Sequence, residues 1–151
     1  MNNPNKDVSK FQLNGRTALI TGSTRGIGWA IAKEMAASGA TVYINGREKK
    51  VLDARCKNLS DLGYDAKPAL FDATDISTMD RFLSSTETPV DILVNNAAIR
   101  LRKPLGDISP KNFSELLDAN LTSVYAISRS FAIRIEERGT KGCIINITSI
   151  A

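Results

Sequence analysis

The chain has 151 residues, 42% of them hydrophobic, which is enough for one ordinary domain with one core and too little for two. It has no histidine, which excludes Ser-His-Asp and Cys-His hydrolysis and the histidine-based metal sites. The net charge is +4, but lysine and arginine are scattered, so we expect no nucleic-acid partner. A mildly basic enzyme with an anionic ligand accounts for the charge equally well.

Residues 1–15 are polar, and no apolar run in the chain is long enough to cross a membrane. We therefore expect no membrane contact, a cytoplasmic protein, a polar N-terminal tail over residues 1–15 and one domain over residues 16–151. The two cysteines, Cys56 and Cys143, lie far apart and follow no Cys-x-x-Cys pattern. We expect both to be buried thiols, and we expect no metal site.

Short β-favouring runs alternate with helical patterns along the chain. Strands are predicted over residues 17–21, 41–44, 66–71, 92–94 and 143–148. Helices are predicted between them over residues 27–38, 48–62, 76–85 and 109–138. The longest helix opens on Ser109-Pro110, a favourable pair for an N-cap and a first helical residue. This βαβαβαβαβ order predicts an α/β fold, a Rossmann-type doubly wound parallel sheet with helices on both faces.

The segment 21–28, Thr-Gly-Ser-Thr-Arg-Gly-Ile-Gly, joins the first predicted strand to the first predicted helix. Free backbone N–H groups and the positive end of a helix meet at such a turn, which favours an anion. Gly22 would permit the tight turn, Gly26 the approach of a pyrophosphate and Gly28 the close packing of helix on strand. The spacing is not G-x-G-x-x-G, so a turn without a ligand is the alternative. The predicted cofactor-binding residues here are Gly22, Ser23, Thr24, Arg25, Gly26, Ile27 and Gly28.

The end of the second predicted strand indicates which dinucleotide binds. An NAD site carries an Asp or Glu there for the ribose 2′-hydroxyl, whereas this chain has Asn45-Gly46-Arg47. Arg47 and Arg25 would pair with a 2′-phosphate through charge-assisted hydrogen bonds. The sequence therefore predicts NADP rather than NAD, with two solvated surface arginines as the alternative.

These residues resemble the short-chain dehydrogenase/reductase family, in its single-domain branch with the glycine motif T-G-x-x-x-G-x-G. Phe71-Asp72-Ala73 resembles the segment in which an Asp side chain and the next N–H hold the adenine ring. Asn95-Asn96-Ala97-Ala98 is similar to the family's Asn-Asn-Ala-Gly, which flanks the adenosine ribose, although Ala98 replaces the usual glycine. The resemblance implies that Asp72, Ala73, Asn96 and Ala97 also bind the cofactor.

Two catalytic residues are implied by the same resemblance. Asn120 looks like the helix asparagine that holds a water molecule in the family's proton relay, and Ser149 looks like the serine that hydrogen-bonds the substrate. Asn120 also lies on the apolar stripe of its predicted helix, where the alternative is a structural amide whose hydrogen bonds are satisfied. For Ser149 the alternative is an ordinary serine in the turn after a strand.

The family's catalytic tyrosine, with a lysine four positions later, has no counterpart in this chain. The tyrosines Tyr43, Tyr64 and Tyr125 all precede Ser149, and none has a lysine four positions on. The resemblance therefore implies an N-terminal part of a family member, with five of the usual seven strands. We expect the chain alone to be inactive, with an unpaired fifth strand, an uncovered apolar face on the 109–138 helix and poor stability.

The resemblance implies an NADP-dependent oxidoreductase that interconverts alcohols and ketones by hydride transfer on a small molecule, as a homo-oligomer at full length. Residues 44–47 and 96–104 look similar to the gluconate 5-dehydrogenase group, in which Arg100, Arg102 and Lys103 would meet a sugar-acid carboxylate. A solvated basic loop is the alternative there, and the ketoacyl reductase and tropinone reductase groups stay open. A non-catalytic dinucleotide-binding or assembly subunit is the competing function. A methyltransferase or sugar epimerase is disfavoured by the glycine pattern and the missing strand-end acid.

Overall fold

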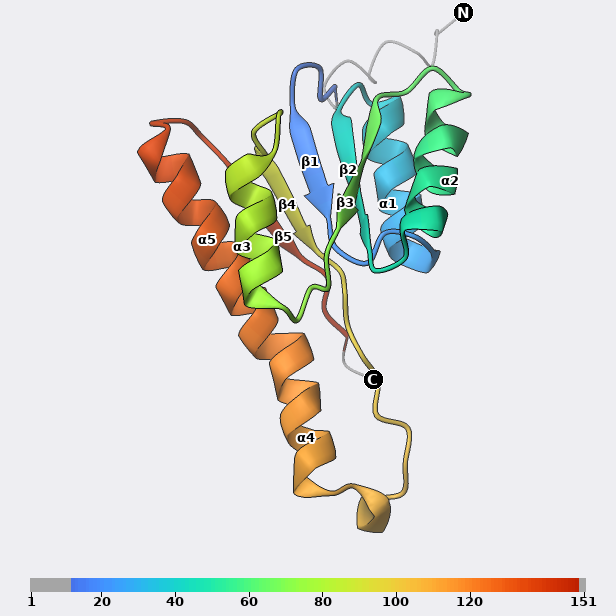
Figure 1. Ribbon diagram of the computed structural model, residues 1–151, viewed down its shortest axis with the longest axis vertical. Helices are drawn as coiled ribbons and strands as arrows, with labels where there is room; N and C mark the ends of the chain where they lie inside the picture. The colour runs from blue at the N-terminus through green and yellow to red at the C-terminus, as the bar shows by residue number, and fades with distance from the viewer. Residues whose placement is uncertain (1–11, 150–151) are drawn as a thin grey trace, which may run out of the picture.

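Five parallel strands form the centre of the molecule (Figure 1). This computed structural model describes residues 12–149, so residues 1–11 of the predicted tail and residues 150–151 lie outside the described range. The strands pair in the order β3-β2-β1-β4-β5, which confirms the predicted Rossmann-type doubly wound sheet. Their bounds are β1 Thr17–Ile20, β2 Thr41–Gly46, β3 Ala66–Leu70, β4 Ile92–Asn95 and β5 Cys143–Asn146.

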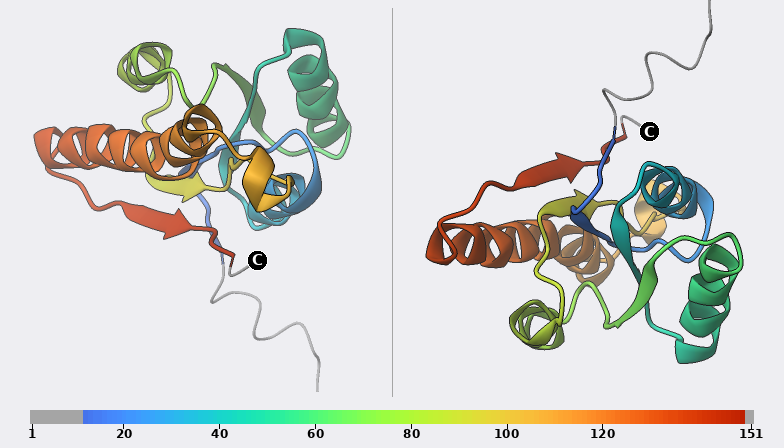
Figure 2. Two further views of the ribbon diagram at one scale, coloured as in Figure 1. Left: turned by 90° about the horizontal axis from the view of Figure 1, so that it is seen from below. Right: turned by 90° about the horizontal axis from the view of Figure 1, so that it is seen from above.

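Helices cover both faces of the sheet (Figure 2). Helices α1 (Gly26–Ala37) and α2 (Lys49–Ser60) lie on one face, and α3 (Ile76–Ser85) and α5 (Ser123–Glu137) lie on the other. Side chains alternate along a strand, so β1 supplies both cores. Its Ala18 and Ile20 pack with α1 and α2, whereas Leu19 packs with α3 and α5. Pro68 is accommodated because β3 is an edge strand, where a missing ladder donor costs little.

The strand order reverses at β1, and this reversal positions the candidate site. The chain adds β2 and β3 on one side of β1, then crosses over and adds β4 and β5 on the other side. At such a switch point a crevice opens beyond the carboxyl ends of the strands, and ligands of doubly wound folds bind there. The glycine turn after β1 and the segment after β4 both begin at this edge.

The helix predicted over residues 109–138 contains a π-helical turn that the sequence did not indicate. Helix α4 (Pro110–Leu117) begins at Ser109, whose side chain accepts from the Asn112 N–H as predicted for an N-cap. The π turn η4 (Asp118–Thr122) follows and leads into α5. In this wider turn the Ser123 N–H donates to the carbonyl of Asp118, while the Ser123 hydroxyl donates to the carbonyl of Ala119. Short π turns of this kind are frequent at functional sites.

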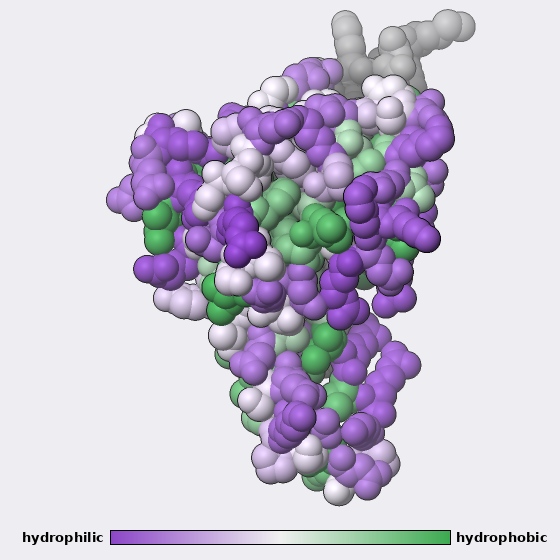
Figure 3. Space-filling view, viewed as in Figure 1, coloured by the Kyte–Doolittle hydropathy of each residue, from purple (hydrophilic) through white to green (hydrophobic). Residues whose placement is uncertain are grey.

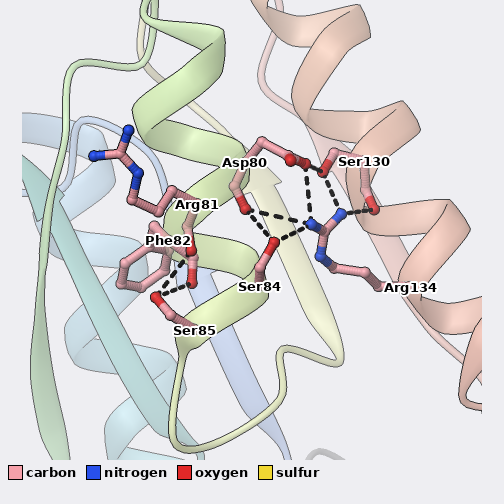
Figure 4. A network of polar contacts seen from close by, with 7 residues as sticks. All are labelled: Asp80, Arg81, Phe82, Ser84, Ser85, Ser130 and Arg134. Carbon is pink, nitrogen blue, oxygen red and sulfur yellow. Dashed lines mark hydrogen bonds and ion pairs between the residues drawn. The ribbon is translucent and has the colours of Figure 1, made fainter.

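A polar network ties α3 to α5 on the second face (Figure 4). The Arg134 guanidinium lies 3.0 Å from the Asp80 carboxylate and also donates to the Ser130 hydroxyl over 2.6 Å. The Ser130 hydroxyl in turn donates to Asp80, and Arg134 contacts Ser84 at the next turn of α3. Four side chains, two from α3 and two from α5, thus share one network of hydrogen bonds that links the two helices.

The described residues leave the β5 side of the molecule uncovered. Every residue of β5 is exposed, and within residues 12–149 the strand pairs only with β4. The prediction that Cys143 is buried is therefore wrong, because no described element packs on the strand that carries it, whereas Cys56 is half-buried. Apolar side chains are also exposed along α4, η4 and α5, and some show among polar ones where α4 projects from the body in Figure 3. They are Phe113, Leu117, Leu121 and Tyr125.

None of the helices within residues 12–149 is long and apolar enough to cross a membrane. At the N-terminal side, Leu13 packs against the core under α1, and its N–H donates to the Ser38 carbonyl. The short 3-10 helix η3 (Leu105–Asp107) completes the elements, in the segment between β4 and α4.

Candidate functional site

The glycine turn between β1 and α1 contains two residues with a positive φ, a conformation that glycine adopts more readily than any other residue. Gly22 has φ +62° and Gly26 has φ +58°. A Cβ placed on Gly22 would lie 3.0 Å from the Ala97 Cα, so the segment after β4 approaches the turn closely. A Cβ on Gly26 would meet nothing within 4 Å, so the backbone there borders open space. Gly22 thus forms the tight turn, and the space beside Gly26 is open to a ligand.

Gly28 brings α1 against the turn. A Cβ at this position would lie 2.7 Å from the Gly22 carbonyl oxygen and 3.0 Å from the Ser23 Cα, and it would also overlap the Asn96 side-chain amide. The contacted atoms are mostly backbone, so no side-chain rotation would relieve the overlap. The close packing predicted for Gly28 is thus present.

The rim of the turn offers unpaired donors to an anion. Arg25, Gly26 and Ile27 are exposed, and α1 begins at Gly26 without a side-chain cap on its first turn. The first N–H groups of a helix have no partner within it, and no acidic residue stands in this first turn to satisfy them. The exposed positive end of α1 therefore suits a phosphate group.

Ser23 lies beneath this rim rather than on it. Its side chain is fully buried, its hydroxyl donates to the Ile20 carbonyl over 2.7 Å, and the same oxygen accepts from the Asn45 N–H over 2.9 Å. The Ser23 N–H donates to the Asn45 carbonyl. Ser23 therefore fastens the turn to β2.

Asn45 is a site residue that the sequence reasoning missed. Its side chain is 2% exposed, and it accepts from the Gly22 N–H over 3.0 Å. Its amide donates to the carbonyls of Ala69 and Phe71, at 3.0 and 3.1 Å. One amide thus joins the ends of β2 and β3 to the glycine turn. The available signal was an asparagine at the end of an otherwise apolar strand, where burial requires hydrogen-bond partners.

The segment after β4 is attached to the turn from the other side. The Thr21 hydroxyl accepts from the N–H groups of both Asn96 and Ala97, each over 2.9 Å. The Asn96 amide donates to the carbonyl of Thr21 over 2.9 Å and contacts that of Gly22 at 3.3 Å. Asn96 and Ala97, predicted to bind the cofactor, are therefore brought together with the glycine turn.

Arg47 and Asp72 meet at the ends of β2 and β3. The Arg47 guanidinium lies 3.6 Å from the Asp72 carboxylate and is 77% exposed. Partial burial acts to raise the pKa of Asp72, but hydrogen bonds from Thr74 and the charge of Arg47 outweigh it and lower that pKa below its usual value. Asp72 is thus an ionised group whose other oxygen is held by Thr74 at 2.8 and 2.9 Å. Ala73, the next residue, is half-buried beside it.

The turn and the end of β2 also touch directly. A Cβ on Gly46 would lie 2.7 Å from the Thr24 methyl carbon, so Gly46 leaves the space that Thr24 occupies. Arg25 follows Thr24, and Arg47 follows Gly46. The two arginines predicted to hold a 2′-phosphate therefore stand on adjoining segments.

Asn120 and Ser149 lie in the less covered part of the molecule. Asn120 in η4 is exposed rather than buried on an apolar stripe, and its side chain pairs with the backbone of Ile99 in both directions, each bond 2.9 Å long. It therefore anchors the segment after β4 to the π turn. Ser149 follows β5 and is exposed. Because β5 is parallel to β4, Ser149 emerges at the same sheet edge as the glycine turn.

Within residues 12–149 no three His, Cys, Asp or Glu side chains gather in a way that would hold a metal ion. The donors of the site are backbone N–H groups, amides and guanidinium groups, a set that suits phosphates and sugar hydroxyls.

Fold and site together define a Rossmann-type α/β domain of the nucleotide-binding class, with an exposed glycine turn at the strand switch point. The chain belongs to the short-chain dehydrogenase family, whose model, described as short chain dehydrogenase, matches residues 16–151. This is a family of NAD(P)-dependent oxidoreductases that act on CH–OH groups.

Several relatives carry names related to gluconate. The chain is 38% identical over 143 residues to a gluconate 5-dehydrogenase of Gluconobacter oxydans, covering 93% of this chain and 56% of the relative. A putative gluconate dehydrogenase of Agrobacterium tumefaciens superposes with a TM-score of 0.87 at 40% identity, over 92% of this chain and 56% of the other. A gluconate 5-dehydrogenase of Burkholderia cenocepacia, in complex with NADP and tartrate, gives 0.84 at 37% identity, over 94% and 56%.

Related solved structures include complexes with NADP and with NAD. The chain spans somewhat more than half the length of the relatives it matches.

Proposed function

We propose that the protein is an NADP-dependent oxidoreductase that interconverts an alcohol and a ketone. The observation that carries this proposal is the exposed glycine turn flanked by Arg25 and Arg47, with no carboxylate at the end of β2. Bound NADP would supply the hydride acceptor, and its reduced form the donor. The residues that would hold it are the turn from Gly22 to Gly28 for the pyrophosphate, Arg47 for the 2′-phosphate, Asp72 and Ala73 for adenine, and Asn96 and Ala97 for ribose.

Arg47 is available for a 2′-phosphate because its present partner holds it weakly. A separation of 3.6 Å from Asp72 at a largely exposed guanidinium corresponds to a surface ion pair, which contributes about 0–1 kcal/mol. A phosphate offers the same guanidinium a bidentate, charge-assisted geometry.

We propose Ser149 as the residue that hydrogen-bonds the substrate oxygen, and Asn120 as part of the proton relay. The support for Ser149 is its exposed position at the carboxyl edge of the sheet. The support for Asn120 is its place in a π turn whose hydrogen-bond pattern departs from the α-helical one. Its side chain is committed to Ile99, so its contribution to the relay is to hold the backbone of the π turn and of the segment after β4 in place.

We propose a sugar acid as the substrate class. Arg100 and Arg102 are exposed on the segment between β4 and α4, and Lys103 contacts the Asn112 side chain at 3.2 Å. Three cations on a segment that starts beside the glycine turn would attract a substrate carboxylate. The gluconate-related names of the relatives support the same class.

We also propose that the protein associates with itself at full length. The exposed apolar residues along α4, η4 and α5 are its support, because soluble monomers seldom leave such a stripe open. A non-catalytic dinucleotide-binding or assembly subunit is the second candidate, favoured by the same stripe of exposed apolar residues.

Two measurements on the purified chain test the proposal. One is a titration with NADPH and NADH, and the other is an assay of 5-ketogluconate reduction. We expect binding with a lower Kd for NADPH and no turnover, since a missing acid–base residue alone costs a factor of about 10²–10⁴. Failure to bind either dinucleotide would remove both the oxidoreductase and the dinucleotide-binding subunit. Turnover by the chain itself would show that an acid–base group outside the family pattern is present.

A further inference from the structure

One arginine of α2 reaches across to the glycine turn. The Arg55 Nε–H donates to the carbonyl oxygen of Thr24 over 2.8 Å, a partly buried bond between residues 31 positions apart. The Arg55 guanidinium carbon also lies 4.8 Å from the ring centroid of Trp29 in α1. The Arg55 side chain thus connects α2, which carries it, to the glycine turn and to α1.

The bond to Thr24 fixes the direction of the next donor in the turn. In a trans peptide the carbonyl and the N–H point in opposite directions. With the Thr24 carbonyl held toward α2, the Arg25 N–H points away from α2. Arg25 and Gly26 form the exposed rim at the start of α1. Arg55 therefore orients a backbone donor of the phosphate cradle without occupying the cradle itself.

Thr24 is confined from a second side by β2. Its methyl group fills the space that a side chain on Gly46 would take. The Thr24 peptide is therefore held between the end of β2 and the side chain of Arg55. A charge-assisted hydrogen bond is stronger than a neutral one, and a cation–π contact is stronger when it is partly desolvated. No ion pair to a carboxylate of residues 12–149 competes for Arg55 in the structure.

We propose that Arg55 is a positioning residue of the cofactor site, which acts through the Thr24 carbonyl to aim the backbone of the glycine turn at the pyrophosphate. This inference rests on the proposed function, because it requires a dinucleotide at the turn. Both NADP and NAD carry the pyrophosphate, so loss of Arg55 weakens the two cofactors by the same factor. In this it differs from Arg47, whose proposed partner is the 2′-phosphate of NADP alone.

Trp29 gives the test a local optical signal, because it is the only tryptophan in the chain. We would titrate NADPH and NADH into the wild type and the variants Arg55→Met and Arg55→Lys, and follow quenching of Trp29 emission. We expect Arg55→Met to raise both Kd values about tenfold. Arg55→Lys keeps the charge and a donor, and we expect it to raise both values by about two- to threefold. The matched control is Arg81→Met, which removes the same charge from α3 on the opposite face and leaves both Kd values unchanged.

Quenching of Trp29 by acrylamide in the cofactor-free chain tests the contact separately. We expect a higher quenching constant in Arg55→Met than in the wild type, because the guanidinium no longer covers the indole ring. If Arg55→Met does not fold, the proposal is tested by Arg55→Lys alone, for which we expect the Kd values of NADPH and NADH to rise by the same factor. Unchanged Kd values in both variants would overturn it, and so would a loss confined to NADPH, which would make Arg55 a direct ligand of the 2′-phosphate. A wild-type chain that binds neither dinucleotide would refute the proposed function, and this inference with it.

Discussion

The two sides of the sheet differ in how their polar groups are held. On the β2 side, Asn45 is buried and makes three hydrogen bonds that join two strand ends and the glycine turn. On the β5 side, Asn120 also uses both ends of its amide, but it is exposed and grips a single residue of an exposed segment. A buried amide whose partners are removed leaves an unpaired group costing about 1–3 kcal/mol, whereas water replaces the partners of an exposed one.

The two sides therefore differ in the function that the described residues can support by themselves. The glycine turn is hydrogen-bonded to β2, whose residues 42–45 are buried, and also to the segment after β4 and to Arg55 of α2. Ser149 follows a strand whose every residue is exposed. The geometry of the glycine turn is therefore fixed by packing and hydrogen bonds, while the residues proposed for chemistry stand in the more exposed part of the molecule.

The largest effect is expected from a methyl group added to the glycine turn. This turn with β2 and α1 is the enclosed half of the molecule, and the β5 side with the segment between β4 and α4 is the open half. We expect Gly28→Ala to raise the Kd for both NADPH and NADH by about 100-fold, because its Cβ would press on the backbone at Gly22 and Ser23. Overpacking of this kind costs about 1–3 kcal/mol and moves the turn. Fluorescence titration gives the affinity, and a thermal melt gives the loss of stability.

Gly106→Ala is the matched control in the open half, since a Cβ there would meet nothing within 4 Å. We expect it to leave both Kd values and the melting temperature unchanged. Equal effects of the two substitutions would show that the enclosed half is no more constrained than the open one.

A second test separates the parts of the cofactor site. We expect Arg47→Asp to raise the Kd for NADPH about 30-fold and that for NADH by no more than about twofold, because only NADPH carries the 2′-phosphate. Arg129→Asp, an equal change of charge on α5, should leave the ratio of the two Kd values as it is. Equal weakening of both cofactors by Arg47→Asp would contradict the assignment of Arg47.

The sheet and its helices were predictable because their signals are local. Glycines at positions 22, 26 and 39, apolar runs and the Ser109-Pro110 cap mark the elements within a few residues of the observed bounds. The π turn at residues 118–122 was not predictable, because one extra residue in a helical turn hardly changes an apolar pattern. Cys143 was predicted to be buried because the two cysteines lie far apart and follow no Cys-x-x-Cys pattern, yet burial depends on what packs over the strand.

The candidate site was predictable to the extent that it consists of backbone. The roles of Gly22 and Gly28 follow from turn geometry, and the structure bears them out. The side chains that brace the turn were missed, since Asn45 resembles an ordinary turn residue and Arg55 an ordinary surface residue of α2. An asparagine at the end of an apolar strand indicates a need for hydrogen-bond partners, but the partners of Asn45 and Arg55 lie 23 and 31 residues away along the chain, and no local pattern identifies them.

The smallest effect is expected in the network between α3 and α5. The hydrogen bond from Ser130, with some opposition from burial, and the charge of Arg134 lower the pKa of Asp80 below its usual value. A carboxyl group with a lower pKa in the folded than in the unfolded chain stabilises the fold above about pH 4, and this contribution is lost as the pH falls through the folded-state value. Because the Asp80 side chain is half exposed, solvent screening limits the contribution to about 0.5 kcal/mol.

We therefore expect Asp80→Asn to lower the free energy of unfolding slightly at pH 7 and to match the wild type in acid. Urea unfolding at a series of pH values measures the difference, with the exposed Asp107→Asn as a control that changes neither end of the series. A difference between Asp80→Asn and the wild type that persisted unchanged into acid would mean that the network acts through packing of α3 on α5 rather than through the charge of Asp80. Neither variant should change the Kd for NADPH, because the network lies on the face of the sheet opposite α1 and α2.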